Sequence, residues 1–177
     1  MGAARVVLAT GSLWVRDGQG RAHHAPVPGS EDAPVYSPDD VMNGTVIEGP
    51  VVIFDDDHYY MGGVLAELLR GQGAEVTLVT TASDVSSWTH NTMEQGFIQA
   101  RLLELGVTIK TNHNLVSIGN GVAELACTYT GRTESVACAA TVMVTMRLPD
   151  DALYHALKAD AAANEAAGIA SIDRIGD

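Results

Sequence analysis

The fold is decided by the stretch Val51-Val52-Ile53-Phe54-Asp55-Asp56-Asp57-His58-Tyr59-Tyr60-Met61-Gly62-Gly63-Val64-Leu65-Ala66-Glu67-Leu68-Leu69. An apolar run is followed by a short polar crossing, a pair of glycines and apolar residues at helical spacing. A strand, a crossing, a glycine and an amphipathic helix in this order form the layout of a dinucleotide-binding βα turn. The stretch therefore predicts a βα unit of an α/β fold.

The same turn lacks the parts that bind a nucleotide. Counted back from the helix, Gly62 falls on the third fingerprint glycine, whereas Asp57 and Tyr59 replace the first two. A Tyr side chain blocks the close backbone approach that the second glycine permits. Three carboxylates also repel the pyrophosphate that a helix N-terminus otherwise binds. After the next strand, Thr80–Ser83 offer neither an acidic residue for a ribose nor an Arg for a 2′-phosphate. We expect a retained fold with a lost site, and NAD(P)H binding is the alternative.

From Gly49 onward the chain alternates between strand and helix patterns. Short β-branched runs predict strands at 51–54, 75–80 and 107–111. Helical spacing predicts helices over 62–71 and 92–105, the second with one apolar side made of Met93, Phe97, Ile98, Leu102 and Leu105. A βαβαβ order with short connections implies a parallel sheet with right-handed crossovers.

The pattern changes after residue 111. The Gly119-Asn120-Gly121 and Thr130-Gly131-Arg132 turns predict an antiparallel meander with strands at 114–118, 122–128 and 134–139. Another apolar strand is expected at 142–145. Pro149-Asp150-Asp151 then opens a helix, for which we expect a buried stripe made of Leu153, Leu157 and Ala161.

The two ends of the chain resemble each other in being isolated strands. Arg5–Thr10 reads as a buried strand with no partner near it in sequence, and a short strand ends at Gly176-Asp177. Residues 13–36 lack periodicity and are expected to form a long surface connection. Ser37–Met42 predicts a short helix with Ser37 as its N-cap and Pro38 at its first position. We infer a middle domain flanked by two pieces of a second sheet.

Composition excludes several classes of protein. A net charge of −12 with only ten Lys and Arg argues against nucleic acid binding. No apolar run approaches the roughly 20 residues of a membrane span, and the N-terminus lacks the apolar region of a secretion signal. Cys127 is expected to face about Ser135, and Cys138 about Glu124, which puts the thiols too far apart for a disulfide. A reducing cytoplasm is therefore expected.

Three local clusters have a structural and a functional interpretation. Asp55-Asp56-Asp57-His58 contains metal-ligand types, but consecutive residues at a strand end point in alternating directions, so we expect solvation or helix-dipole support and no metal site. Trp88 is either a helix-entry residue packed on the core or an exposed docking anchor. His23-His24 reads as a solvated loop feature. No Ser or Cys forms a nucleophilic triad with a His.

Two sets of residues carry a resemblance to known proteins. Ala9-Thr10-Gly11-Ser12 and Ile175-Gly176-Asp177 resemble the crossings of glutathione-reductase-type flavoproteins, in which an NAD(P)H-binding domain is inserted into an FAD-binding domain. Phe54–Gly63 and Ser87–Thr92 resemble the C-terminal region of trimethylamine dehydrogenase and its relatives, the dimethylamine and histamine dehydrogenases and the demethylases of N-methylated amino acids. The resemblance covers nearly the whole chain and indicates the group but no particular substrate.

The resemblance implies a longer parent protein. In that family a TIM barrel with FMN and a [4Fe–4S] cluster precedes the nested domains, a small amine is oxidised, and electrons pass to an electron transfer flavoprotein. A barrel needs about 250 residues and a cluster usually needs four Cys, whereas this chain has 177 residues and two Cys. We therefore expect a C-terminal fragment that is mainly structural or docking, does not catalyse alone and holds no cofactor alone.

The resemblance also assigns domains and site residues. Residues 47–146 become a degenerate NAD(P)-binding-like Rossmann domain, a three-layer unit with parallel sheet and meander, and 1–46 with 147–177 become remnants of an FAD- or ADP-binding-like domain. The cofactor-facing positions implied by the family are Thr10, Gly11, Asp57, His58, Tyr59, Gly62, Gly176 and Asp177, and Trp88 is the docking candidate. Two alternatives remain, an active NAD(P)H-dependent reductase module, as in the related dienoyl-CoA reductases, and a stand-alone module with an organic ligand in the old cofactor cleft.

Overall fold

The computed structural model describes residues 2–176 and divides the chain into two compact units. The larger unit is Trp14–Met146, and the smaller unit combines Met1–Leu13 with Arg147–Asp177. The division falls between residues 13 and 14 and between residues 146 and 147. Residues 14–46 pack with the larger unit.

A parallel sheet forms the centre of the larger unit. Within the described residues its order is β3-β10-β4-β5-β6, and all neighbouring strands are parallel. Alternate residues of β4 point to opposite faces, so that Val51 and Ile53 enter one buried cluster while Val52 and Phe54 enter another. The strands are β3 (Val35–Tyr36), β4 (Pro50–Asp55), β5 (Glu75–Thr80), β6 (Thr108–Lys110) and β10 (Ala140–Val144).

Helices cover one face of this sheet. Val41, Leu65 and Leu102 bring α1 (Pro38–Met42), α2 (Met61–Gly71) and α3 (Gln95–Glu104) into one buried cluster with β4 and β5. Ser37 caps α1 as predicted, since its hydroxyl accepts from the Asp40 backbone N–H at 3.3 Å and the Asp40 carboxylate accepts from Ser37 N–H at 2.7 Å.

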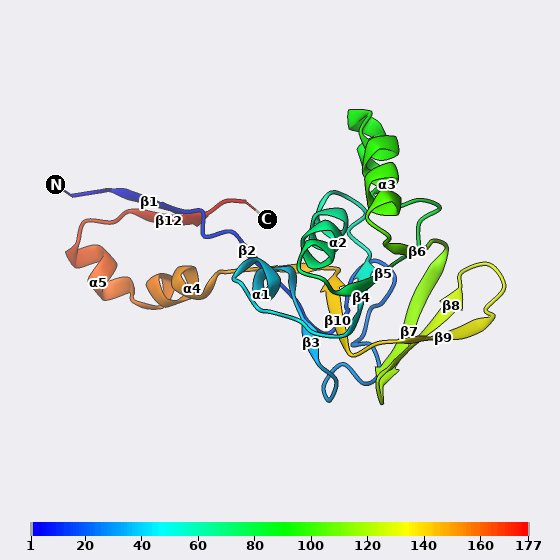
Figure 1. Cartoon of the computed structure of the whole chain (residues 1–177). Coiled ribbons are helices and arrows are strands. Elements are labelled where there is room, and N and C mark those ends of the chain that lie inside the picture. The colour runs from blue at the N-terminus through cyan, green and yellow to red at the C-terminus, as the bar shows by residue number, and fades with distance from the viewer. Residues whose placement is uncertain (1, 177) are drawn as a thin grey trace. The chain divides into compact units, whose positions relative to one another are not determined.

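An antiparallel sheet covers the other face (Figure 1). Its strands are β7 (His113–Gly119), β8 (Val122–Cys127) and β9 (Thr133–Ala137), and Leu115, Ala123 and Leu125 pack with Phe54. The expected meander is thus present, but its expected register is wrong. Glu124 pairs with Ser135, and Cys127 donates its backbone N–H to Arg132 O at 2.9 Å, because the turn closes between Cys127 and Gly131. Both cysteines are free thiols.

The predicted helix 92–105 is wrong at its N-terminal end. A 3₁₀ helix, η1 (Ser87–Thr92), comes first, and Met93 has a φ of 61°, a left-handed conformation that separates η1 from α3. Met93 is 85% exposed and Phe97 81% exposed, so neither belongs to the packed side of α3. The residues of α3 and its C-terminus that face the core are Ile98, Leu102 and Leu105.

Residues 13–36 also differ from expectation, because part of this connection is core. Val27 is 1% exposed and packs with Phe54 and Met143. The imidazole of His23 lies 5.8 Å from the Phe54 ring, centroid to centroid, and its Nε2 is buried, so the expectation of a solvated His pair is wrong for this residue. The sequence of residues 13–36 shows no periodicity because core contacts such as those of His23 and Val27 come from a loop and not from a helix or strand.

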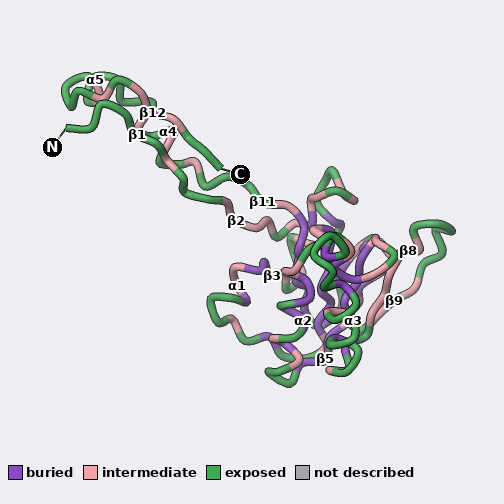
Figure 2. The backbone as a smooth tube through the Cα atoms, turned by 90° about the horizontal axis from the view of Figure 1, so that it is seen from above, coloured by how far each residue is buried: buried purple, intermediate pink, exposed green. Residues whose placement is uncertain are grey.

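The smaller unit has little core of its own. Its strands β1 (Arg5–Leu8) and β12 (Ser171–Arg174) are parallel, β2 (Ser12–Trp14) pairs with β11 (Arg147–Pro149), and α4 (Ala152–Ala159) and α5 (Ala161–Ala166) follow. Among its described residues, Ile172 alone is buried. Figure 2 shows the backbone of this unit mostly in the colours of exposed and intermediate residues.

Two expectations for the smaller unit are wrong. The buried stripe is absent, because Leu153 is 50% exposed and Asp160, with φ −103° and ψ 68°, ends α4 before Ala161. The first strand is mostly exposed as well, with Val7 at 46%. Within residues 2–176 no helix has the length and apolarity needed to span a membrane.

Candidate functional site

The altered dinucleotide turn lies at the carboxyl end of β4, next to β10. The backbone N–H groups of Asp56 and Asp57 both donate to Val144 O, at 2.9 and 3.1 Å. Gly62 then lets α2 approach the strand closely, because a Cβ at this position would lie 2.5 Å from Asp55 Oδ2. The helix–strand contact that the third fingerprint glycine permits is therefore present.

Asp55 is a fully buried carboxyl group. Its Oδ1 accepts from the His58 backbone N–H at 3.0 Å, and the side chain is inaccessible to solvent. Burial raises the pKa of Asp55 to about 7, against the opposing influence of the His58 N–H and imidazole. Solvation, one of the two roles expected from the sequence, is therefore wrong for this residue.

Asp56 is also buried, and one oxygen of its carboxylate, Oδ2, is well partnered. Its Oδ2 accepts from the backbone N–H groups of Arg21 and Ala22, at 2.5 and 2.8 Å, and its Oδ1 lies 3.6 Å from His58 Nε2. Burial acts to raise the pKa of Asp56, but these hydrogen bonds outweigh it and hold the pKa below its usual value. Asp56 therefore acts as a charged anchor for the loop at Arg21.

The next two residues of the turn, His58 and Tyr59, contact neighbouring side chains. His58 has a φ of 64°, and its Nε2 lies 3.1 Å from Thr81 Oγ1. The Tyr59 ring packs on the Tyr60 ring with 4.3 Å between centroids. The turn thus brings Asp55, Asp56 and His58 together. It presents carboxylates where a dinucleotide turn presents backbone N–H groups.

Trp88 stands beside this turn, in η1. Its backbone N–H donates to His58 O at 3.0 Å, its side chain is 49% exposed, and the Arg21 guanidinium lies 4.9 Å from the ring centroid. The indole is therefore half-exposed and covered on one side by a cation, which is a favourable arrangement for such a pair. Arg21 is a residue of this cluster that sequence reasoning missed, because nothing near Arg21 in sequence points to Trp88.

The family positions at the chain ends lie around one hollow in the smaller unit. Thr10, Gly11 and Gly176 line a cavity of about 190 Å³, together with Asp151, Tyr154 and Arg174, among others. Asp177 lies outside the described residues. A hollow of this size is below the roughly 300–1,000 Å³ of ligand pockets.

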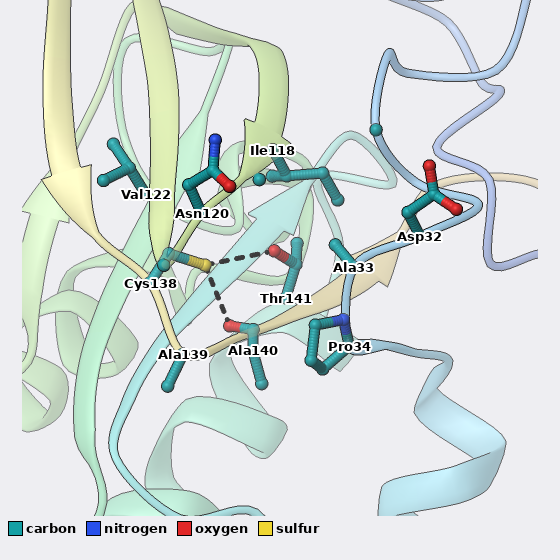
Figure 3. A pocket seen from close by; sticks show the side chains of 13 residues that line it. Asp32, Ala33, Pro34, Ile118, Asn120, Val122, Cys138, Ala139, Ala140 and Thr141 are labelled. Carbon is teal, nitrogen blue, oxygen red and sulfur yellow. Dashed lines mark hydrogen bonds between the residues drawn. The ribbon is translucent and has the colours of Figure 1, made fainter.

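A larger cavity lies at the opposite, amino end of β10. It measures about 370 Å³ and is lined by Asp32, Pro34, Asn120, Cys138 and Thr141, among others. Cys138 Sγ lies 3.1 Å from Ala140 O and 3.2 Å from Thr141 Oγ1 (Figure 3). Burial raises the pKa of this thiol, which keeps it protonated and unreactive. The sequence signals for this cavity were the Gly119-Asn120-Gly121 turn and the β10 run, but neither indicates a ligand.

Comparison with known proteins places the chain in a family. Residues 36–140 match the family model described as the OYE-like second alpha/beta domain. This match covers more than half of the chain. The chain belongs to this family. Within residues 2–176, no group of three His, Cys, Asp or Glu side chains is arranged to hold a metal ion.

Relatives of this OYE-like domain include amine-oxidising enzymes. Dimethylamine dehydrogenase of Hyphomicrobium sp. (strain x) is 32% identical over 197 residues, which cover 99% of this chain and 27% of that protein. The structure of histamine dehydrogenase from Rhizobium sp. 4-9 has 44% identity and a TM-score of 0.93, over 99% of this chain and 28% of that one. The 6-hydroxypseudooxynicotine amine oxidase of Pseudomonas geniculata N1 has 39% identity and a TM-score of 0.92, over 99% and 26%.

The chain therefore spans about a quarter of the length of these relatives. The resemblance to the trimethylamine, dimethylamine and histamine dehydrogenase family is confirmed, and so is an α/β fold with a mostly parallel sheet.

Proposed function

We propose that this chain is the C-terminal part of an iron–sulfur flavoprotein that oxidises a small amine and passes electrons to a flavoprotein acceptor. The observation that carries the proposal is the match to histamine dehydrogenase over 99% of the chain at 44% identity and a TM-score of 0.93. Dimethylamine dehydrogenase, a second amine dehydrogenase, matches over the same extent.

The redox centres belong to the remainder of the parent protein. FMN would sit in a barrel of about 250 residues, and a [4Fe–4S] cluster usually needs four thiolates, whereas this chain contributes two separate free thiols. The residues present do not fit either group. The two free thiols support a reducing, cytoplasmic location.

The part played by this segment is architectural. The larger unit is a degenerate NAD(P)-binding-like Rossmann domain of the glutathione-reductase type, and the smaller unit is a remnant of an FAD- or ADP-binding-like domain. This assignment is supported by the parallel pair β1–β12, since two parallel strands with one buried residue need more strands and covering layers to be stable.

Amine-dependent reduction of an artificial dye by the full-length parent protein tests the proposal. Dimethylamine and histamine are the first substrates, and NADH and NADPH are tested as electron donors in the same assay. The proposal requires reduction with an amine and none with the nicotinamides. Reduction by NADPH without an amine would instead identify a reductase.

Trp88 is the candidate docking residue for the flavoprotein acceptor. An exposed Trp at the edge of a rigid element is a typical interface anchor. In the parent protein, Trp88→Ala should slow reduction of the acceptor flavoprotein about tenfold, or about 1.4 kcal/mol, and leave amine turnover with the dye unchanged. Tyr129→Ala, at an 82% exposed ring on the β8–β9 turn, is the control and should change neither rate. Equal loss of both rates in Trp88→Ala would refute docking.

A further inference from the structure

One loop of the larger unit lies against the ends of β4 and β10. We call the segment Asp17–His24 the strap. Its Arg21 and Ala22 N–H groups donate to Asp56, the first residue after β4, at 2.5 and 2.8 Å. At Gly20 the strap backbone approaches so closely that a Cβ would lie 2.6 Å from Asp56 Oδ2 and 3.1 Å from Thr145 Cβ, at the end of β10.

The position of the strap matters because of the strand order. The chain continues from β4 to β5 and β6 on one side of the sheet, whereas β10 and β3 lie on the other side of β4. The carboxyl ends of β4 and β10 are therefore the switch point of the sheet. Open α/β sheets bind their ligands in the crevice outside these strand ends, and here the strap lies in that place.

The chemistry of the contact is the reverse of nucleotide binding. In a dinucleotide turn, backbone N–H groups of the turn donate to the pyrophosphate of the ligand. Here the turn supplies the anion, Asp56, and the strap supplies two backbone N–H donors. Hydrogen bonds to a carboxylate are stronger than neutral ones, and burial of Asp56 protects them from solvent.

Two side chains of the strap make further contacts. The Arg21 guanidinium lies over the Trp88 ring at 4.9 Å, and the His23 ring lies 5.8 Å from Phe54. The strap thus contacts the turn, η1 and the core of the sheet, and it carries a cation toward an acidic turn.

We infer that the strap is a built-in occupant of the switch-point crevice and that it excludes nicotinamide nucleotides from it. The carboxylate of Asp56 binds the strap through the backbone N–H groups of Arg21 and Ala22. The β4–α2 turn, which lacks two of the three fingerprint glycines, binds the strap where a dinucleotide turn binds a pyrophosphate. The crevice is closed by the protein's own chain in addition to having lost its phosphate-binding residues. This inference is independent of the reaction proposed for the parent protein.

Hydrogen exchange of the 177-residue chain, read by mass spectrometry, tests the inference. The Arg21 and Ala22 amides should exchange at least about tenfold more slowly than those of an unprotected chain. Gly20→Ala places a Cβ against Asp56 and should remove most of this protection. Gly96→Ala, where a Cβ meets nothing within 4 Å, is the control and should leave it unchanged.

Asp56→Asn provides a second variant in case Gly20→Ala does not fold, as judged by circular dichroism. It keeps the shape of the side chain, removes the charge and should lower the protection of both amides several-fold. Addition of millimolar NADH or NADPH to the wild-type chain should change no exchange rate in the strap. Free exchange of both amides in the wild type, unchanged protection in both variants, or displacement of the strap by a nucleotide would each overturn the inference.

Discussion

Asp55 and Asp56 are adjacent and equally buried, yet their pKa values move in opposite directions. The difference lies in their partners. Asp56 Oδ2 accepts from two backbone amides and the His58 imidazole lies 3.6 Å from Asp56 Oδ1, whereas Asp55 Oδ1 accepts from the His58 backbone N–H; Asp55 Oδ2 and Asp56 Oδ1 have no hydrogen-bond partner among residues 2–176. A carboxylate without a full set of donors is costly to bury, so Asp55 retains its proton over a wider pH range.

This difference predicts a pH-dependent stability. The folded protein holds the Asp55 proton between pH 3.8 and about 7, while the unfolded chain releases it. The contribution of Asp55 to the free energy of unfolding therefore falls as the pH rises through this window, by at most about 4 kcal/mol, and is constant above it. In Asp55→Asn the group cannot ionise, and its amide oxygen can still accept from His58 N–H.

Thermal denaturation of both proteins near pH 4 and above pH 7 measures the effect. The variant should be more stable than the wild type above pH 7 by about 1–3 kcal/mol and should lose this advantage near pH 4. A wild-type protein that gains stability across the window relative to Asp55→Asn would show that Asp55 is ionised in the fold.

At the scale of elements, α2 is held against β4 by the absence of a side chain at Gly62. Gly62→Ala introduces a methyl group 2.5 Å from Asp55 Oδ2 and 2.9 Å from Asp55 Cβ. Overpacking of this kind should lower the free energy of unfolding by about 1–3 kcal/mol. Gly71→Ala, at the last residue of the same helix and with open space around its Cβ, should be neutral or stabilise by up to about 1 kcal/mol. Urea denaturation compares the two, and equal effects would contradict the close approach.

The helix α3 separates residues that the sequence places on one side. Phe97 is 81% exposed and Leu102 is 1% exposed. Phe97→Ser should therefore change stability by less than about 0.5 kcal/mol, whereas Leu102→Ala should cost about 2–5 kcal/mol. Urea denaturation decides this as well. A large loss in Phe97→Ser would place its ring in a packed environment.

At the scale of the whole molecule, the two units differ in how much of their chain is buried. In the smaller unit Ile172 is the buried residue among those described, whereas the larger unit buries both faces of its sheet. Limited proteolysis should therefore remove residues up to about Leu13 and beyond about Arg147 first, and leave a resistant fragment close to Trp14–Met146. Mass spectrometry identifies the fragment. Early cleavage within β4 or β5 would contradict the division.

Much of the larger unit could be predicted from the sequence. The β4 run, the Ser37 cap and the helix after Gly62 are local signals, because spacing and capping act over a few residues. The replacement of the first two fingerprint glycines by Asp57 and Tyr59 is also visible locally in the sequence. The errors fall where contacts are distant. Met93 adopts a left-handed conformation and Phe97 is exposed. Both features depend on how η1 packs, and this packing leaves no signal in the hydrophobic periodicity of the sequence.

The sequence by itself determined that this chain is an α/β protein with an altered dinucleotide turn, because strand and helix periods and the turn residues are local signals in consecutive positions. The motifs Phe54–Gly63 and Ser87–Thr92 carried the resemblance to the amine dehydrogenases. Only the tertiary structure decided what the three Asp residues do. Asp56 accepts hydrogen bonds from the amides of Arg21 and Ala22, which are 35 and 34 residues away in the sequence, and Asp55 is inaccessible to water. Burial and distant partners set the charge of each carboxylate, and neither can be read from a run of neighbouring residues.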